Sequence, residues 1–320
     1  MEQIVILSGK GGTGKTTVAA ALAHLAAQEA SLVLADADVD AANLELVLTP
    51  TRLEEHDFIG GKVAVIDPER CTGCGLCAQV CRFEAIVEQR SRGAEVQGRI
   101  SPAPLLPCSP APSLPRSSAP LLKVDPIACE GCAVCYYQCP VQAIRLEEPV
   151  AGRWFRSQTR FGPLFHAHLF AGQENSGKLV MIVKQQARLL ALDTGADLLV
   201  DGPPGIGCPV IASLAGADLA LIVTEPTVAG VHDLERILGV ARYFQVPATL
   251  CINKYDLSSV KTREIETFAT RQGIEVIGHI PFDPVVTQAM VQGLPVTVYT
   301  EGPVAKELRQ MWARLSSMLC

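Results

Sequence analysis

The sequence carries less positive than negative charge and has no long apolar run. Its 27 Lys and Arg residues face 33 Asp and Glu residues, for a formal net charge of −6. This balance argues against broad binding to a phosphate backbone, so nucleic acid is not expected as a partner. No apolar stretch approaches the roughly 18 to 20 residues of a membrane-spanning helix. Met1 leads into the apolar residues 4–7 without a basic, cleavable leader, so we expect a cytoplasmic protein.

Cysteine, in contrast, is abundant, with 12 residues. Secreted disulfides are one use of so many cysteines, but eight of them follow a spacing typical of thiolate metal sites in reducing compartments. They form two C-x2-C-x2-C-x3-C runs: Cys71, Cys74, Cys77 and Cys81, then Cys129, Cys132, Cys135 and Cys139.

The chain is long enough, at 320 residues, for a large α/β domain and a smaller module. Residues 3–7 predict a strand, 15–29 an Ala-rich helix and 32–35 a buried strand. Between residues 60 and 149 the pattern changes to short strands, cysteine runs and turns, which indicates an insertion. Within it, residues 90–120 are rich in Pro, Ser, Ala and Arg and predict a mobile loop.

Helix and strand alternation returns after the insertion. Such alternation predicts an α/β fold with a mostly parallel sheet that helices cover on both faces. The expected helices are 178–192 and 228–244, and the expected strands are 198–200, 219–224, 248–252 and 275–280.

A phosphate-binding loop lies between the first strand and the first helix. Its residues match G-x-x-x-x-G-K-[ST] and are Gly9, Lys10, Gly11, Gly12, Thr13, Gly14, Lys15 and Thr16, with Thr17 directly after them. The glycines allow backbone N–H groups to surround phosphates, Lys15 brings positive charge to the β and γ oxygens, and Thr16 can bind Mg²⁺. We therefore expect a nucleoside triphosphate site.

The second lysine of this loop, Lys10, gives Lys-Gly-Gly-Thr-Gly-Lys-Thr-Thr. This motif resembles the deviant Walker A ATPases, a family that includes MinD, ParA, the Mrp-type cluster carriers and the nitrogenase iron protein. The resemblance implies that Lys10, like Lys15, is catalytic and reaches the partner's phosphates across a nucleotide-dependent dimer. The alternative is a solvated loop lysine.

Two acidic segments match further positions of this family. Asp36 and Asp38 follow the second strand, where the resemblance implies that Asp36 supports Mg²⁺ and Asp38, the third catalytic residue, orients the attacking water. For Asp40, a turn-capping role is as good an explanation as a functional role. Asp201 opens Asp-Gly-Pro-Pro-Gly and resembles the Walker B acid that holds Mg²⁺ through water.

Two later segments resemble the nucleotide-base site of the same family. Asn253 matches the base-contacting position, and Pro281 lies in the loop that flanks the base. The run Asn-Lys-Tyr-Asp from Asn253 also fits the guanine signature N-K-x-D, so GTP stays an alternative. ATP is preferred because the other motifs match relatives that use ATP.

The two cysteine runs resemble bacterial ferredoxins that carry two [4Fe-4S] clusters. In that arrangement three cysteines of one run and the last of the other share a cluster. The resemblance implies Cys71, Cys74, Cys77 and Cys139 for cluster I, and Cys129, Cys132, Cys135 and Cys81 for cluster II. Zinc is the competing metal, but the third cysteine of each run disfavours it. Arg82 replaces the proline usual after the first run.

The remaining cysteines, two histidines and the C-terminal helix are also candidates for functional roles. Cys208 follows Asp201 by seven residues, where the nitrogenase iron protein has a cluster ligand, although an ordinary thiol is favoured here. Cys251 is expected in the core, and Cys108 and Cys320 carry no expected role. His166 and His168 alternate on a strand-like segment that resembles ferredoxin-bearing MinD-like proteins, with a structural role favoured over metal binding. The apolar face of residues 304–319 is expected to dock onto the sheet rather than a membrane.

The whole chain thus resembles a MinD/ParA-type P-loop ATPase (residues 1–59 and 150–320) with an inserted two-cluster ferredoxin domain (60–149). The expected function is ATP binding and hydrolysis coupled to electron transfer, with ATP, Mg²⁺ and two [4Fe-4S] clusters as cofactors. A homodimer or a dimer with a similar subunit, and a redox protein, are the expected partners. The alternatives are an Mrp-type iron–sulfur cluster carrier and a MinD/ParA-like positioning ATPase.

Overall fold

The computed structural model describes residues 1–89, 121–172 and 176–318, which excludes the predicted loop 90–120 with Cys108, and also Cys320. The chain divides into two compact units. Unit 1 comprises Met1–Phe58, Gly152–Leu169 and Asn175–Cys320, and unit 2 comprises Ile59–Ala151 and Phe170–Glu174.

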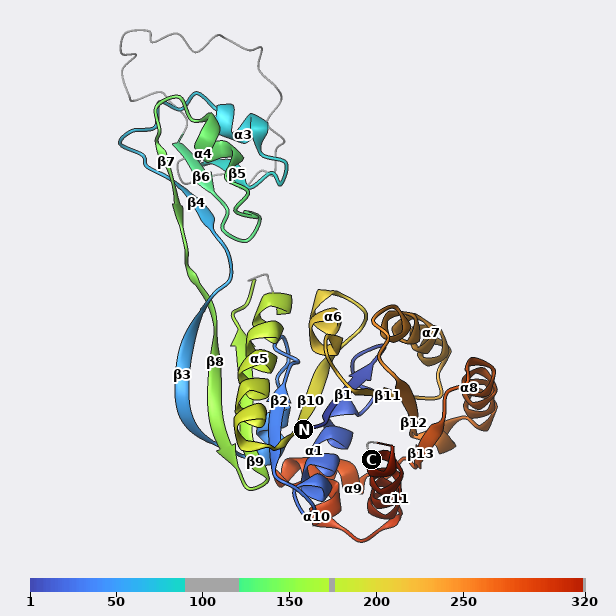
Figure 1. The fold of residues 1–320 in the computed structure, drawn as a ribbon. Helices are drawn as coiled ribbons and strands as arrows, with labels where there is room; N and C mark the ends of the chain where they lie inside the picture. Colours follow the sequence, from blue (N-terminus) through green and yellow to red (C-terminus); the bar gives the residue numbers. More distant parts are fainter. Residues whose placement is uncertain (90–120, 173–175, 319–320) are drawn as a thin grey trace. The chain divides into compact units, whose positions relative to one another are not determined.

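Unit 1 is built on a nine-stranded sheet of order β13-β12-β11-β1-β10-β2-β9-β8-β3 (Figure 1). The neighbours from β13 to β9 pair in parallel, and β8 pairs antiparallel with β9. The strands are β1 (Gln3–Ser8), β2 (Leu32–Asp36), β3 (Thr51–Ile59), β8 (Val150–Thr159), β9 (Gly162–Leu169), β10 (Asp197–Pro204), β11 (Leu219–Thr224), β12 (Ala248–Asn253) and β13 (Val276–Ile280).

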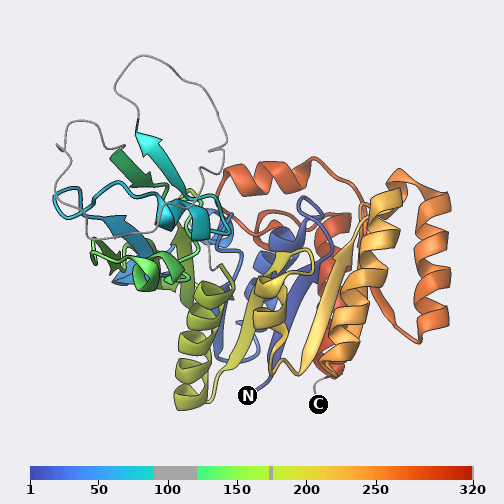
Figure 2. The ribbon, with the colours of Figure 1, turned by 90° about the horizontal axis from the view of Figure 1, so that it is seen from above.

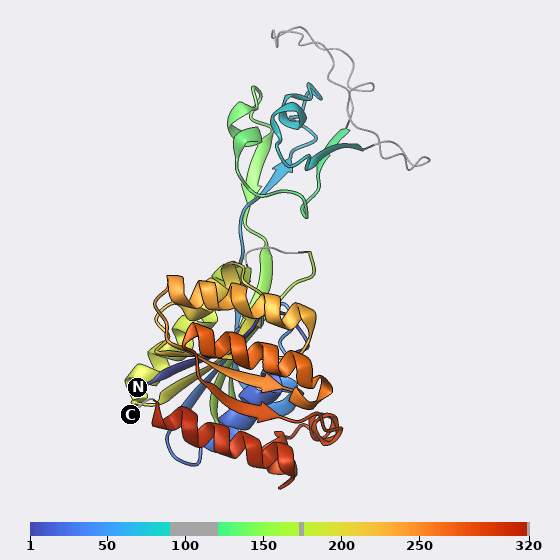
Figure 3. The ribbon, with the colours of Figure 1, turned by 90° about the vertical axis from the view of Figure 1, so that its right-hand side faces the viewer.

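Helices cover both faces of this sheet, with α7 and α8 on one face and α1 and α11 on the other (Figures 2 and 3). Because both faces are covered, the central strands are mostly apolar, and β1, β2 and β11 are buried at every residue. The helices are α1 (Lys15–Ala26), α2 (Leu44–Leu48), α5 (Ser176–Thr194), α6 (Cys208–Leu214), α7 (Val228–Tyr243), η2 (Tyr255–Leu257), α8 (Ser259–Gln272), α9 (Val285–Val291), α10 (Val296–Tyr299) and α11 (Pro303–Ser317).

The predicted α/β fold with a mostly parallel sheet is confirmed, but the sequence analysis missed β3 and β8. β3 has one buried residue, Phe58, and its other side chains are exposed, so it lacks the apolar run that marks the central strands. Ion pairs take the place of apolar packing there: Arg153 on β8 lies 2.6 Å from Glu55, and Arg156 lies 2.9 Å from Glu54. Charge on such an edge discourages pairing with other chains.

The last helix, α11, docks onto the sheet through Val304, Leu308, Met311 and Leu315, each at most 1% exposed. Contacts between α11 and β13 confirm the predicted docking. No helix among the described residues has the length and hydropathy needed to span a membrane.

Unit 2 is an internal duplication. Its two antiparallel strand pairs are β4 (Val63–Ile66) with β7 (Ile144–Glu147), and β5 (Ile86–Gln89) with β6 (Leu121–Val124). Each half has a one-turn helix, α3 (Leu76–Val80) and α4 (Val134–Gln138). The halves exchange matching 2.7 Å backbone hydrogen bonds, from Asp67 N to Ala143 O and from Asp125 N to Ala85 O. The cysteine runs therefore lie in one shared core.

Candidate functional site

The phosphate-binding loop follows β1, and its last two residues, Lys15 and Thr16, begin α1. Two of its glycines, Gly12 (φ 80°) and Gly14 (φ 88°), adopt the left-handed conformation that other residues disfavour. A Cβ on Gly14 would lie 2.2 Å from Nδ2 of Asn253. Both the backbone conformation and this close approach require glycine, so the motif's last glycine has a structural as well as a phosphate-binding reason.

Lys15 is buried at the centre of an acidic group. Its Nζ lies 2.6 Å from Oδ1 of Asp201 and 3.6 Å from Oδ2 of Asp38. Burial favours the neutral amine, but the negative charge and hydrogen bond of Asp201, with Asp38 and Asp36 behind it, outweigh burial and raise the pKa of Lys15. The lysine is therefore charged and held where an incoming phosphate would compete for it.

Asp36 and Asp201 lie side by side because parallel strands end at the same edge of the sheet. Asp36, the last residue of β2, is paired with Asp201 of β10, and both side chains are buried. Burial and the neighbouring charge of Asp201 raise the pKa of Asp36 to about 8. Backbone N–H groups of Leu44 and Asp38 donate to the Asp36 carboxylate at 3.0 and 3.1 Å. Such crowded carboxylates suit a divalent cation.

The residues present fit Mg²⁺. Oδ2 of Asp201 and the hydroxyl of Thr13 are buried without a hydrogen-bond partner, so both have capacity for a ligand. Carboxylate and hydroxyl oxygens are the donors that Mg²⁺ prefers. Thr16 is half-buried beside Lys15 at the start of α1, whereas the Thr17 hydroxyl faces the sulfur of Met290 at 3.7 Å. The structure thus brings Lys15, Asp36, Asp38 and Asp201 together.

Lys10 is tethered within its own chain by a residue that the sequence analysis missed. Glu225, directly after β11, has one carboxylate oxygen 2.5 Å from Nζ of Lys10 and the other 3.2 Å from Nζ of Lys254. Burial opposes the ionised form of Glu225, but hydrogen bonds from the two lysines outweigh burial and lower its pKa. The signal that could have found Glu225 is its place at the carboxyl end of a parallel strand, where ligand-facing residues gather.

Of the two expected base-site residues, Asn253 contacts the phosphate loop. Nδ2 of Asn253, at the end of β12, donates to the carbonyl of Thr13 at 2.7 Å. The next acid of the run, Asp256, accepts from the backbone N–H of Phe282 at 2.8 Å, next to Pro281. The first bond joins the end of β12 to the phosphate loop, and the second joins the segment after β12 to the segment after β13. Base contacts by Asn253 and Pro281 stay a prediction.

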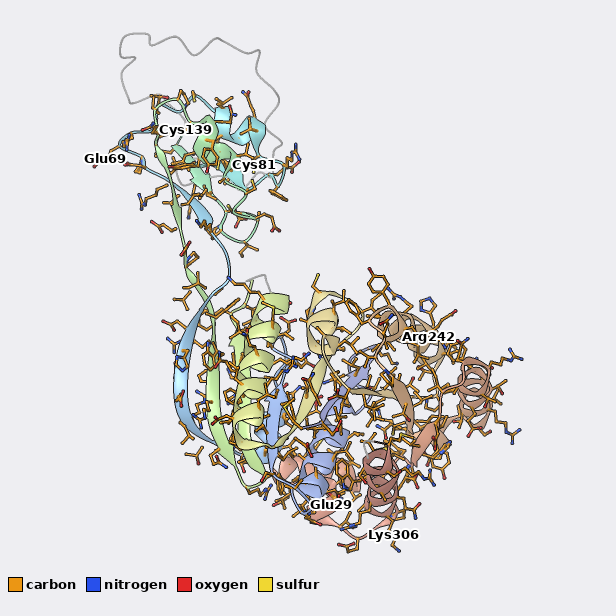
Figure 4. The ribbon with its side chains drawn as sticks, viewed as in Figure 1. Glu29, Glu69, Cys81, Cys139, Arg242 and Lys306 are labelled. Atoms are coloured by element: carbon orange, nitrogen blue, oxygen red, sulfur yellow. The ribbon has the colours of Figure 1, made fainter. Side chains whose placement is uncertain are left out.

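Two hollows in unit 2 are each lined by four cysteines and by apolar residues. Hollow A holds Cys71, Cys74, Cys77 and Cys139. Hollow B holds Cys129, Cys132, Cys135 and Cys81. Each hollow therefore combines three cysteines of one run with the last cysteine of the other, the same grouping that the ferredoxin resemblance implies. Cys81 and Cys139, the crossing members, are labelled in Figure 4.

The donor chemistry of the hollows fits iron–sulfur clusters. Backbone N–H groups point at three sulfurs, from Gly73 to Cys71 at 3.4 Å, from Ala85 to Cys81 at 3.4 Å and from Ala143 to Cys139 at 3.2 Å. Such bonds stabilise metal-bound thiolates. Burial raises the pKa of Cys77 to about 11 and also raises that of Cys135, so these thiols need a metal to be ionised at neutral pH.

The other described cysteines lie outside the hollows. Cys251 is fully buried in β12, as predicted for a core residue. Cys208 is exposed at the first residue of α6.

Comparison with known proteins agrees with this geometry. The chain is 27% identical over 317 residues to the uncharacterized protein MJ0578 of Methanocaldococcus jannaschii, covering 99% of this chain and 97% of that one. It is 25% identical over 136 residues to the iron-sulfur cluster carrier protein of Pyrococcus horikoshii, covering 38% and 45%. The structure of septum site-determining protein MinD with Mg-ADP from Pyrococcus horikoshii has the same fold, with a TM-score of 0.57, 16% identity and coverage of 100% and 98%.

A family model covers most of the chain as well. The model described as the CobQ/CobB/MinD/ParA nucleotide binding domain matches residues 4–296. That range includes the phosphate loop, the acidic group around Lys15 and the strand ends that carry Glu225 and Asn253. The chain therefore belongs to the CobQ/CobB/MinD/ParA nucleotide-binding family.

Proposed function

We propose that this protein binds and hydrolyses ATP and that its nucleotide state controls electron transfer through two [4Fe-4S] clusters. The observation that carries the proposal is a phosphate loop and two four-cysteine hollows in one chain. A nucleotide site provides a switch with two states, and the clusters, when bound, supply one-electron redox centres. ATP hydrolysis needs no iron–sulfur cluster, and electron transfer needs no nucleotide. Because one chain contains both sites, we infer that the protein couples the two activities.

The nucleotide half of the proposal assigns a role to each buried charge. Lys15 exchanges its 2.6 Å contact with Asp201 for the β and γ oxygens of ATP. Asp201 and Asp36 are then free to hold Mg²⁺ together with Thr16. Asp38, 14% exposed, faces the same lysine from the open side and orients the attacking water. The family membership supports these roles, since they follow the family's motif positions.

The redox half of the proposal depends on which cysteine sulfurs are close enough to bind the same cluster. Hollow A and hollow B each offer four thiolates, the ligand number of a [4Fe-4S] cluster. Apolar side chains line each hollow, Ile66, Leu122 and Ile144 in hollow A and Ile86 and Val124 in hollow B, and their low polarity, with the N–H···S bonds, would tune the reduction potential of a bound cluster.

Coupling of the two halves predicts an effect of ATP on electron-transfer rate. The dithionite-reduced, full-length protein is mixed anaerobically with an oxidised ferredoxin or a viologen acceptor in a stopped-flow instrument, with and without MgATP. We expect the rate to change with MgATP in the parent and to stay constant in Lys15→Ala, which cannot use the nucleotide. Equal rates for the parent with and without MgATP reject the coupling.

A second candidate function is that of an iron–sulfur cluster carrier. It is favoured by the 25% identity to the carrier of Pyrococcus horikoshii, although that match covers 38% of this chain. A carrier must release its cluster, whereas a redox protein retains it. Transfer of iron from the loaded protein to an apo-ferredoxin, followed by circular dichroism of the acceptor, separates the two: retention supports the redox function and MgATP-stimulated transfer supports the carrier.

The tether on Lys10 yields a prediction about the proposed nucleotide-dependent dimer. If Lys10 has to reach a partner's phosphates, it must leave Glu225, whose Oε1 lies 2.5 Å from its Nζ. Glu225 and the partner's phosphates then compete for Lys10. Glu225→Gln removes that charge pair, which is partly exposed and worth about 1 kcal/mol, so ATP-dependent dimerisation is expected about fivefold tighter. Analytical ultracentrifugation with MgATP measures the change.

A matched control exists on the neighbouring helix. Glu235→Gln changes the same charge at an exposed position of α7 that has no ion pair among the described contacts, and should leave dimerisation as in the parent. Unchanged or weaker dimerisation of Glu225→Gln would show that the tether does not compete with the partner.

A further inference from the structure

A cluster of metal-ligating side chains lies in unit 1, apart from the phosphate loop and the cysteine hollows. Glu45 on α2, and His166 and His168 on β9, have ligand atoms that all lie within 4.8 Å of one another. His166 and His168 are two residues apart on a strand, so their side chains emerge on the same face. That face is opposed by Glu45, more than 100 residues away in the sequence, which brings three donors to one point.

The distances suit a shared ion. Nδ1 of His166 lies 3.0 Å from Oε2 of Glu45, and Nε2 of His168 lies 2.9 Å from Oε1. Two ligands bound to one zinc ion at about 2.0 Å each, with tetrahedral angles, lie roughly 3.3 Å apart. The two histidine–carboxylate contacts are already close to that spacing, and all three residues offer ligand atoms within 4.8 Å of one another, so small side-chain movements bring them around one ion.

The state of His166 points to a ligand rather than to a closed hydrogen-bond network. The side chain is fully buried, yet its Nδ1 has no hydrogen bond of acceptable geometry despite the short distance to Glu45. The other ring nitrogen, Nε2, is 2.9 Å from the buried hydroxyl of Ser157. That contact fixes the ring and leaves Nδ1 directed at the cluster, which is how an outer hydrogen bond orients a metal-binding histidine.

The surroundings suit an exchangeable cation. The ring of His166 is fully buried, and burial favours the neutral imidazole, the form that binds metals. His168 is 40% exposed and gives the ion a path from solvent. Arg52, whose Nη2 lies 3.8 Å from Oε2 of Glu45, is half-exposed and packs over the ring of Phe155, so it steadies the carboxylate from outside.

We propose that Glu45, His166 and His168 form a binding site for a divalent first-row transition-metal ion such as Zn²⁺. Two imidazoles and one carboxylate are a common ligand set for such ions and leave a coordination position for water. The end of β2 and the loop after it are bonded to both elements that carry the ligands: Leu44 N, at the start of α2, donates to the Asp36 carboxylate, and Leu169 N, at the end of β9, donates to the carbonyl of Val39. An ion bound here links α2 to β9, the two elements bonded to the segment that carries Asp38.

The test is a zinc-binding comparison on the full-length protein with its iron loaded. Parent, His168→Ala and Glu45→Gln are titrated with Zn²⁺, and bound zinc is counted by mass spectrometry. We expect one zinc ion in the parent that binds more than about 10-fold more weakly in both variants. His232→Ala, an exposed histidine on α7, should bind zinc as the parent does. The difference between parent and variants isolates this site from any zinc held by cysteines.

Zinc K-edge absorption identifies the ligands directly. The extra ion should show nitrogen and oxygen neighbours at about 2.0–2.1 Å, whereas cysteine sulfur lies at about 2.3 Å. Melting curves establish that each variant is folded. Equal zinc binding by the folded parent and His168→Ala, or an absorption spectrum with sulfur neighbours alone, overturns the proposal in favour of a structural hydrogen-bond cluster.

Discussion

Replacing Cys71 and Cys139 together by alanine is expected to remove half of the bound iron, whereas replacing Cys129 and Cys139 together is expected to remove nearly all of it. The first pair lines one hollow, and the second pair is divided between hollow A and hollow B. Two [4Fe-4S] clusters hold about eight irons, so Cys71→Ala/Cys139→Ala should keep about four. Iron analysis and electron paramagnetic resonance of the reduced protein measure the outcome.

These double variants decide between two ways of grouping the same cysteines. If each run held its own cluster, the results would be reversed, because Cys129 and Cys139 belong to one run and Cys71 to the other. Cys208→Ala is the matched control, since its thiol is exposed in unit 1 and lies in neither hollow. Colourless parent protein without iron, after anaerobic purification, would contradict the cluster proposal as a whole.

Lys15→Ala is expected to lower ATP hydrolysis by at least about 100-fold, because it removes the positive charge that would face the transferring phosphate. Nucleotide affinity should fall as well. The substitution also leaves Asp201 and Asp36 buried without their counter-charge, and breaking a buried pair of this kind costs about 3–5 kcal/mol. Steady-state hydrolysis, nucleotide titration and thermal melting of the parent and the variant measure the three effects.

Two comparisons separate the catalytic effect from the loss of stability. Asp38→Asn keeps Lys15 and its 2.6 Å contact with Asp201, so it should bind nucleotide but hydrolyse it slowly. Lys306→Ala removes an exposed lysine of α11 and should match the parent in every assay (Figure 4). Nucleotide binding by Lys15→Ala that is as tight as in the parent would contradict the assignment of the phosphate site.

Local patterns predicted the central strands and the helices that cover them, because the strands are buried on both faces and each helix buries one apolar face. β11, at Leu219–Thr224, has the predicted bounds, and α7 ends one residue before the predicted end. The edge strand β3 was missed because it faces solvent along most of its length and is rich in Glu, Asp and Arg. Its pairing depends on Arg153 and Arg156, about 100 residues further along the chain.

The contacts of the candidate site likewise include some that the sequence predicted and others that it did not. The proximity of Asp36 and Asp201 could be anticipated, since parallel strands end at one edge of a sheet. The tether between Lys10 and Glu225 could not, because no periodicity relates two loops more than 200 residues apart. The meeting of Glu45 with His166 and His168 was equally hidden, although the alternation of the two histidines on a strand was visible.

The sequence by itself determined the chemistry that this protein can offer: a glycine loop with two lysines, carboxylates after apolar strands, and eight cysteines at cluster spacing. These features are local, because turn geometry and strand burial act over a few residues. Tertiary structure decided which groups meet: the cysteines of each hollow, the carboxylate that holds Lys10, and the three ligands of the proposed metal site. Such contacts follow from the packing of distant segments, which no short stretch of sequence encodes.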